Sequence, residues 1–247
     1  MTRPRFVVSA SALDGARCEL RGPEFRHLRV RHLRSGSTVV LTDGHGRERA
    51  GTIVSVGRDH AVVALQALTA PAPGTGGVRI VLALGLLKAD RFDLVVEKAT
   101  ELGVDEIIPF ASERTVAQAG PTRLARWSRI AVAATKQSQR PTVPRVSPPT
   151  TLPEVLRRDA ETLRLFLWED APTGWVHAAE LSQCHPASIL LVVGSEGGFA
   201  PAEAEAAGRH AFRLIRLGQR PLRAETAALA ALAVCQFLWG SCRPAPS

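Results

Sequence analysis

The sequence lacks the patterns that mark several common kinds of site. Its four cysteines include no CxxC pair and its seven histidines no HExxH motif, so neither a zinc site nor a disulfide framework is indicated. No apolar run approaches the roughly 20 residues of a membrane helix, and the apolar stretch near the N-terminus is too short for a signal peptide. We therefore expect a cytoplasmic protein that uses no metal.

What the sequence does contain is an apolar core and an excess of positive charge. Hydrophobic residues make up 45% of the 247 residues, enough for one large domain or two modest ones and too many for a disordered chain. Lysine and arginine outnumber aspartate and glutamate by 31 to 23, and the sequence pI is about 10.5. This balance favours a nucleic acid partner; the alternative is a generally arginine-rich composition that serves solubility.

Residues 1 to about 70 have the pattern of a small β-barrel. Short β-branched segments separated by turn residues predict several strands. The Asp43-Gly44 and His45-Gly46 pairs predict a hairpin between two of them. The proline- and glycine-rich segment 71–77 then reads as a linker. The predicted strands are 5–10, 37–43, 49–57 and 60–68.

After the linker, buried strands alternate with helices, which predicts a mostly parallel α/β sheet. In the first helix, Asp90 is the expected cap and Gly103 the end. The buried positions expected in the first two helices are Phe92, Val95, Val96 and Ala99, then Leu124, Trp127, Ala131 and Ala134. The predicted strands are 78–87, 104–110, 163–169, 188–194 and 212–218; the helices are 89–103, 121–140, a short one from Pro201, and 224–240.

Two polar loops follow adjacent strands of this sheet. In open parallel sheets, ligands bind beyond the carboxyl ends of the strands. Residues 194–199, with the sequence GSEGGF, fit neither GxGxxG nor a phosphate-binding P-loop, and Glu196 would repel a phosphate. A serine hydrolase elbow around Ser195 lacks its first glycine, and only His210 follows it. The remaining alternative is a plain glycine turn with Glu196 in solvent.

Residues 217–226, with the sequence LGQRPLRAET, form the second loop. It carries Arg220, Arg223 and Glu225 just before an apolar helix. It could be no more than an exposed helix cap, but two polar glycine-containing loops at adjacent strand ends are better explained by one shared ligand pocket.

These two loops together resemble the RsmE-type ribosomal RNA uracil-N3 methyltransferases of the SPOUT, or α/β-knot, superfamily. The resemblance covers nearly the whole chain and extends to Arg114 and to Arg126-Trp127. The sequence departs from the family pattern at Ser195, at Pro221 and Ala224, and at Arg31-His32. Further matching segments are RHLRVRHLRSG at 26–36, the K-x-D-R of 88–91, EKATELGV at 97–104 and QSQRPTVP at 137–144.

The resemblance implies the fold, the activity and the partners. The expected fold is α/β, with a PUA-like β-barrel that binds RNA over residues 1–72 and a SPOUT trefoil-knot methyltransferase domain with a mostly parallel sheet over 73–247. The implied activity is methylation of N3 of a specific uridine in small-subunit (16S) ribosomal RNA by a homodimer that uses S-adenosylmethionine. The alternatives are a ribose 2′-O-methyltransferase of the same superfamily and a non-catalytic RNA-binding factor for ribosome assembly.

The resemblance also implies site residues. Because N3 of uracil must lose a proton, we expect a base, either Glu196 or Glu225, and Arg223 as its electrostatic partner. The alternative is that either glutamate pairs with an arginine and only holds the loop in shape. The expected cofactor-binding residues are Gly194, Ser195, Glu196, Gly197, Gly198, Leu217, Gly218, Leu222, Arg223 and Thr226.

Basic residues outside the loops are candidates for RNA contacts, although any one group could be an ordinary solvated face. We expect Arg126, Arg129, Lys136 and Arg140 on one side of the 121–140 helix. The remaining candidates are Arg26, His27, Arg29, Lys88, Arg91, Lys98 and Arg114.

The last helix, over residues 224–239, is apolar nearly all round. A helix that covers one face of a sheet needs only one apolar stripe. Its second face is therefore expected to pack against another copy of the chain, with burial inside a single subunit as the alternative.

Overall fold

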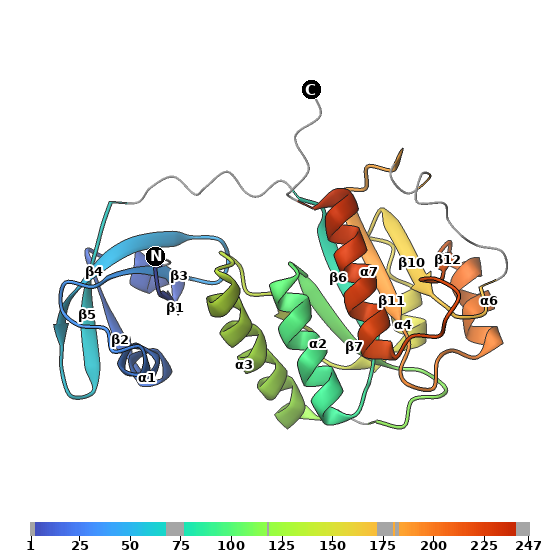
Figure 1. Cartoon of the computed structure of the whole chain (residues 1–247), viewed down its shortest axis with the longest axis horizontal. Coiled ribbons are helices and arrows are strands. Elements are labelled where there is room, and N and C mark those ends of the chain that lie inside the picture. The colour runs from blue at the N-terminus through green and yellow to red at the C-terminus, as the bar shows by residue number, and fades with distance from the viewer. Residues whose placement is uncertain (1–2, 68–76, 118, 172–179, 181–182, 241–247) are drawn as a thin grey trace. The chain divides into compact units, whose positions relative to one another are not determined.

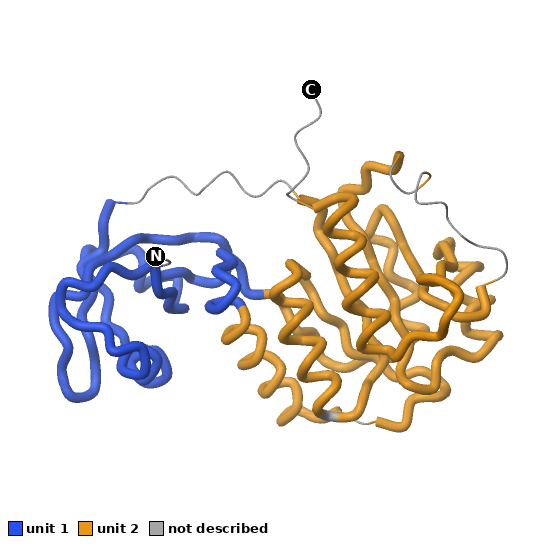
Figure 2. The backbone as a smooth tube through the Cα atoms, in the orientation of Figure 1, with its two compact units in different colours: residues 1–75, 135–143 blue, residues 76–134, 144–247 orange. Residues whose placement is uncertain are grey.

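The computed structural model describes residues 3–67, 77–117, 119–171, 180 and 183–240. The chain divides into two compact units (Figure 2), one of residues 1–75 and 135–143, the other of residues 76–134 and 144–247. The predicted domain boundary at residues 72 and 73, and all of the predicted linker except Gly77, lie outside the described residues.

The first unit contains a mixed five-stranded sheet in the order β1-β3-β4-β5-β2. The strand β1 runs parallel to β3, and the other pairs are antiparallel. The four predicted strands are present, although the one predicted over 5–10 covers only Arg5–Val7, and Phe6, Leu28, Leu41 and Ile53 are among the fully buried core residues. The elements are β1 Arg5–Val7, a 3-10 helix Ala10–Leu13, β2 Arg17–Arg21, α1 Gly22–Val30, β3 Thr38–Thr42, β4 Glu48–Val56 and β5 His60–Leu65.

The strand β2 and the helix α1 were not predicted. In β2 the sequence RCELR turns only Cys18 and Leu20 inward and exposes three charged residues, so its apolar signal is weak. In α1 only Phe25 and Leu28 of the nine residues are buried. Short elements with two inward side chains each fall below what hydrophobic periodicity can identify.

The predicted hairpin between β3 and β4 is confirmed, and its turn is held by an aspartate. Oδ1 of Asp43 accepts hydrogen bonds from the backbone N–H groups of His45 and Arg47, at 2.8 and 3.1 Å. Residues after α3 add to this unit, because the Val143 N–H donates to the Gly44 carbonyl and the Thr42 hydroxyl donates to the Pro141 carbonyl. A single domain boundary between residues 72 and 73 cannot assign residues 135–143 to the first unit.

The second unit contains a parallel sheet in the order β12-β10-β11-β6-β7-β8, with β9 paired to β7. The predicted parallel α/β sheet is confirmed. The strands are β6 Arg79–Gly85, β7 Glu106–Ala111, β8 Arg145–Val146, β9 Thr150–Thr151, β10 Leu163–Leu167, β11 Ser188–Val193 and β12 Arg213–Ile215; the helices are α2 Ala89–Glu101, α3 Pro121–Ser138, α4 Leu152–Leu156, α6 Pro201–Arg209 and α7 Ala224–Trp239.

Helices cover both faces of this sheet. The helices α2 and α7 lie side by side, and α7 packs on β6 and β11 (Figure 1). Phe92 of α2 packs against Trp127 of α3, with ring centroids 4.2 Å apart and the rings tilted by 32°. Residues of α4 and α6 pack on the other face, in a core with Phe110, Phe166 and Leu190. None of the helices within the described ranges is long and apolar enough to cross a lipid bilayer.

Two local predictions in this unit were wrong or incomplete. Lys88, rather than Asp90, is the N-cap residue of α2, and its carbonyl accepts the N–H groups of Arg91 and Phe92. Asp90 lies in the first turn, where its negative charge still suits the helix dipole. The strand predicted over 212–218 covers only Arg213–Ile215, and β8, β9 and α4 were not predicted.

A network of ionised side chains holds together the amino ends of the strands. Arg79 of β6 contacts Glu106 of β7 at 2.7 Å and Glu161 at 3.2 Å, and Arg158 contacts Glu161 at 2.8 Å. Burial alone would raise the pKa of Glu161, but hydrogen bonds and positive charge from Arg158 and Arg79 outweigh it and lower the pKa from its ordinary value. The folded state therefore favours ionised Glu161.

The substitution Glu161→Gln should lower the free energy of unfolding by about 1.5–3 kcal/mol near pH 7, the range for hydrogen bonds to charged groups. A lowered folded-state pKa stabilises the fold above the unfolded-state pKa of about 4.3, and this stabilisation is lost as pH falls through the folded-state pKa. The difference between wild type and variant should therefore shrink near pH 3. Denaturant titrations at both pH values measure it, with the exposed Glu205→Gln as a control that changes stability by less than about 0.5 kcal/mol. Equal wild-type and variant stability near pH 7 would contradict this account.

Candidate functional site at the carboxyl edge of the sheet

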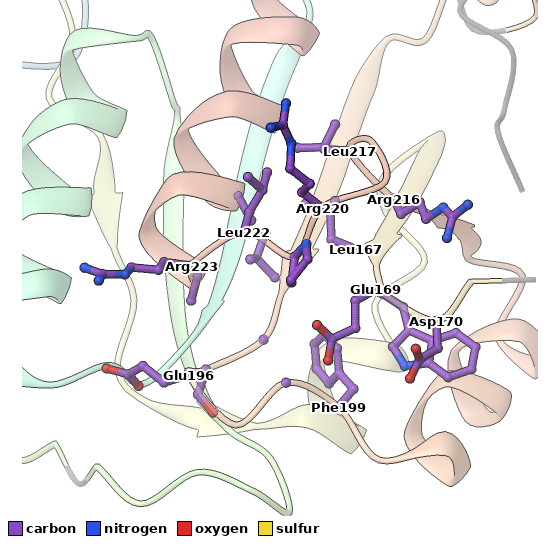
Figure 3. A pocket seen from close by; sticks show the side chains of 18 of the residues that line it. Leu167, Glu169, Asp170, Glu196, Phe199, Arg216, Leu217, Arg220, Leu222 and Arg223 are labelled. Carbon is purple, nitrogen blue, oxygen red and sulfur yellow. The ribbon is translucent and has the colours of Figure 1, made fainter.

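A cavity of about 690 Å³ lies beyond the carboxyl ends of β10, β11 and β12 (Figure 3). The two predicted loops both line it, so the prediction that they share one pocket is confirmed. The lining includes Gly194, Ser195, Glu196, Gly198 and Phe199 from the first loop, with Val193 at the end of β11; Arg216 to Ala224 in and around the second loop; Leu167 to Asp170 at and after the end of β10; and Arg91.

The loop after β11 is a tight turn pressed against the neighbouring strand. The Gly198 N–H donates to the Ser195 carbonyl at 3.0 Å, and Gly198 has a φ of +66°, which glycine adopts without strain. A side chain at Gly85 of β6 would place its Cβ 2.4 Å from the Ser195 nitrogen. The first loop therefore keeps its place only because β6 ends in a glycine.

Ser195 is 5% exposed, and none of the described residues accepts or donates a hydrogen bond at its Oγ. His210 is an exposed residue at the C-terminal end of α6. A Ser–His pair is therefore not formed by these residues, and the serine hydrolase alternative fails on geometry.

A second segment supports the outer side of this loop. The Arg114 guanidinium donates to the Gly197 carbonyl at 3.4 Å. The Glu203 carboxylate accepts the backbone N–H groups of Glu113 and Ala200, both at 2.9 Å. The segment after β7 is thereby tied to the start of α6 and to the loop after β11.

Two acidic residues and one arginine meet at the start of α2. The Lys88 N–H donates to Oε1 of Glu196 at 3.2 Å. Nη1 of Arg91 lies 3.9 Å from Oε1 of Glu196 and 3.8 Å from Oε2 of Glu225. The K-x-D-R segment and both glycine-containing loops therefore converge beside the cavity, as the shared-pocket interpretation requires.

Arg223 lines the cavity, as expected, but it forms no ion pair with Glu196 or Glu225. It is the N-cap residue of α7, and its side chain is exposed at the cavity (Figure 3). Within the described residues, the guanidinium that forms ion pairs with Glu196 and Glu225 is that of Arg91. The catalytic roles expected for Glu196, Glu225 and Arg223 stay predictions.

Most of the predicted cofactor-binding residues line the cavity, and two do not. Among its described lining residues, Gly197 and Thr226 are missing. Gly197 packs on the Arg114 backbone, and a Cβ on it would come within 2.9 Å of the Arg114 carbonyl oxygen. Thr226 lies in the first turn of α7 with an exposed side chain. The predicted residues that do line the cavity are Gly194, Ser195, Glu196, Gly198, Leu217, Gly218, Leu222 and Arg223.

The contribution of a third strand end, that of β10, to the cavity was not predicted. Leu167, the last residue of β10, and Trp168, Glu169 and Asp170 directly after it line the cavity, and Arg216 does so directly after β12. The rule that ligands bind beyond the carboxyl ends of parallel strands would have found the segment after β10, because that strand was predicted.

Some RNA-contact candidates of the first unit have exposed side chains, and others already contact neighbouring residues. Arg26 and Arg29 are exposed on α1. His27 packs edge-on against Phe6, and burial together with the positive charges of Lys136 and Arg31 lowers its pKa. Lys136 is 12% exposed and paired with Glu24, so its placement on an open basic face was wrong. Arg140 lies beyond the end of α3 at Ser138 and so is not on the helix face that was predicted.

Several candidates of the second unit are already engaged. Lys98 pairs with Glu97 and Glu101, and the exposed Arg126 pairs with Asp93 at 2.7 Å. Arg129 donates to a carbonyl in its own helix, and Arg114 contacts the Gly197 carbonyl. Lys88 is exposed, and Arg91 faces the cavity. RNA binding by these side chains stays a prediction.

Comparison with known proteins places this geometry in a family. Residues 76–236 match the model of an RNA methyltransferase domain, and residues 20–66 match that of an RNA methyltransferase PUA domain. The chain is 32% identical over 237 residues to the ribosomal RNA small subunit methyltransferase E of Mycobacterium bovis, which covers 92% of this chain and 88% of that protein. It is 31% identical over 233 residues to the Synechocystis protein of the same name, covering 93% and 76%.

A solved structure agrees over almost the full length. The crystal structure of a ribosomal RNA small subunit methyltransferase E from Neisseria gonorrhoeae, bound to S-adenosyl methionine, has a TM-score of 0.83 and 33% identity, covering 97% of this chain and 99% of that one. The expected fold class is confirmed: an α/β-knot domain with a parallel sheet, preceded by a PUA-like half-barrel. The chain belongs to the RNA methyltransferase family that includes the ribosomal RNA small subunit methyltransferases E.

Proposed function

We propose that this protein methylates N3 of a specific uridine in small-subunit ribosomal RNA, in the cytoplasm, with S-adenosylmethionine as the methyl donor. The observation that carries the proposal is the convergence of three strand ends and the start of α2 on one cavity. The family relatives named above support RNA of the small subunit as the substrate. The uridine and its N3 atom come from the resemblance of the two loops.

The cavity fits S-adenosylmethionine. Its volume of about 690 Å³ falls in the range of about 300–1,000 Å³ usual for small-molecule sites. S-adenosylmethionine carries a carboxylate, an ammonium and a sulfonium together with a flat aromatic adenine ring. The lining offers both signs of charge, with Glu169, Asp170 and Arg220, next to apolar Leu217 and Leu222. The methyl donor would supply an activated methyl group, so the protein needs no metal.

The protein's own residues would bind and orient the two reactants and handle a proton. We propose Gly194, Gly198 and Gly218 as the points where the backbone comes closest to the cofactor. Uracil N3 carries a proton that must leave before N3 can act as a nucleophile. Glu196, Glu225 and Arg223 are the candidates that the resemblance implies for this task, and the target base would have to leave its stack to reach them.

The two units would have different functions. We propose the β-barrel, residues 1–72, as an RNA-binding domain and residues 73–247 as the catalytic domain. Arg26 and Arg29, both exposed on α1, are then candidates for phosphate contacts. The alternatives are ribose 2′-O-methylation and RNA binding without catalysis. Each alternative predicts a different modification pattern in the experiment described next.

The test is the modification state of ribosomal RNA in cells that lack the protein. We expect the loss of one N3-methyluridine from small-subunit RNA, measured by nuclease digestion and mass spectrometry, and its return when the purified protein and S-adenosylmethionine are added. Loss of a 2′-O-methyl group would support the first alternative. An unchanged modification pattern, together with no binding of S-adenosylmethionine in calorimetry, would support the second.

The substitution Gly85→Ala should weaken S-adenosylmethionine binding by tenfold or more. The new Cβ would meet the Ser195 nitrogen at 2.4 Å and the Gly194 carbonyl carbon at 2.8 Å, both backbone atoms that cannot rotate away, so the loop must shift. A tenfold loss of affinity corresponds to about 1.4 kcal/mol. Gly208→Ala in α6 is the matched control, because its Cβ would meet nothing within 4 Å. Calorimetry on both folded variants measures the effect. Wild-type affinity in Gly85→Ala would show that the loop after β11 does not hold the cofactor.

We also propose that the protein is a homodimer that pairs through α7. Ala228, Leu232 and Cys235 face the core, whereas Phe237 is 84% exposed and Val234 43% exposed. The described residues of a single chain therefore leave the outer face of α7 open, which disfavours burial within one subunit. A second copy is the simplest cover for such a face.

Light scattering at micromolar concentration should give a mass near 53 kDa, twice the 26.5 kDa of one chain. Phe237→Asp should shift this mass toward one chain, because it places a charge in the apolar contact. Val30→Asp, at an apolar residue of α1 that is 76% exposed, is the control that should leave the mass unchanged. A wild-type mass of 26.5 kDa would exclude the dimer.

A further inference from the structure

Three charged side chains from separate segments meet beside the cavity: Arg91 of α2, Glu196 of the loop after β11 and Glu225 of α7. The distances from the guanidinium to the two carboxylates, 3.9 and 3.8 Å, are ion-pair distances but too long for hydrogen bonds. None of the described residues accepts a hydrogen bond from this guanidinium. Its donors therefore stay available while two negative charges hold it at the cavity.

The two carboxylates are not equivalent. Glu196 lines the cavity, its side chain is 31% exposed, and only its Oε1 is engaged by the Lys88 N–H. The Glu225 side chain is 14% exposed and does not line the cavity, and its Oε2 is buried with no hydrogen-bond partner among the described residues. A buried carboxylate oxygen is costly unless a counter-charge lies near it. The counter-charge here is Arg91, so Glu225 and Arg91 depend on each other.

We propose that Glu196 accepts the N3 proton of the target uracil, that Arg91 neutralises the negative charge left on the base, and that Glu225 is a positioning residue for Arg91. This assignment rests on the proposed function. It also decides between the two glutamates, since only Glu196 can be reached from the cavity.

The charges balance at each step. Before the reaction, one guanidinium faces two carboxylates. When the proton moves from N3 to Glu196, that carboxylate becomes neutral and one negative charge appears on the uracil. Arg91 then faces Glu225 and the uracil anion, so the local charge is unchanged. The N3 electron pair takes the methyl group, whose former bonding pair leaves with the sulfur, and Glu196 returns its proton to solvent through its exposed side.

Arg91 suits this role better than Arg223 because its place is fixed. A cation that stabilises a developing charge must be held in position before the reaction. Two carboxylates, one on the loop after β11 and one in α7, hold Arg91, whereas the exposed Arg223 side chain forms no ion pair with any described residue. Arg223 remains free to contact the cofactor or the RNA backbone.

The first test removes the cation. Arg91→Ala should lower kcat by about 10²–10³, the size of effect seen when one preorganised group is lost, with S-adenosylmethionine affinity within about threefold of wild type. Added guanidinium ion should restore part of the rate, which a merely structural role would not allow. Arg209→Ala, an exposed arginine of α6, is the charge-matched control and should behave as wild type. Wild-type kcat in Arg91→Ala, or guanidinium rescue in Arg223→Ala but not in Arg91→Ala, would overturn the proposal.

The second test separates the two glutamates. Glu196→Gln should lower kcat by about 10²–10⁴ and gain nothing from guanidinium, because the proton acceptor itself is missing. Glu225→Gln should lower kcat less and should respond to guanidinium. Equal loss in both variants without rescue in either would contradict the division of roles.

A binding measurement gives a readout that does not depend on turnover. A small-subunit RNA transcript made with 5-fluorouridine, whose N3 proton is more acidic, should bind wild type more tightly than the uridine transcript. Arg91→Ala should lose this preference, and Arg209→Ala should keep it. If wild type fails to methylate the RNA, the proposed function is wrong. If wild type is active and Arg91→Ala keeps the 5-fluorouridine preference, only this inference is wrong.

Discussion

The close backbone contact between the end of β6 and the loop after β11 is the constraint on which the rest of the site depends. With no side chain at Gly85, the backbone of Gly194 and Ser195 can lie directly against the strand. That position brings Glu196 to the start of α2, where the Lys88 N–H and the Arg91 guanidinium meet its carboxylate. The lack of a Cβ atom at Gly85 therefore lets the proposed cofactor loop lie against the sheet. It thereby also positions the charged group that is proposed to handle the proton.

The two ends of the parallel sheet have opposite properties. At the amino ends, Arg79, Arg158, Glu106 and Glu161 form short ion pairs and hydrogen bonds. At the carboxyl ends, Arg91 stands at ion-pair distance from two carboxylates without a hydrogen bond to either. Close ion pairs of this kind stabilise a fold, whereas a guanidinium that donates no hydrogen bond keeps its donors available for a ligand. The difference supports placing the chemistry at the carboxyl edge.

Much of the fold could be predicted from the sequence, because apolar patterns within short segments identify the main strands and helices. Long buried runs such as 188–194 identify strands, helical spacing of Phe92, Val95 and Val96 identifies α2, and the order of strand and loop places both glycine-containing loops at one edge. Short elements carried too little apolar pattern, so β2, β8 and β9 were missed. The cap at Lys88 uses backbone only, which no residue preference reveals. The partners of Arg91 are more than 100 residues away in the chain, and only the fold shows them.

The central claim is that one cavity at the carboxyl edge of the sheet holds the methyl donor. Hydrogen–deuterium exchange with and without S-adenosylmethionine tests it most directly, because it reports on each segment separately. The account predicts slower exchange at 194–199, 216–223 and 167–170, and little change at the amino ends of the strands around Arg79 and Glu106. Protection confined to other segments, or no protection at saturating S-adenosylmethionine, would contradict it.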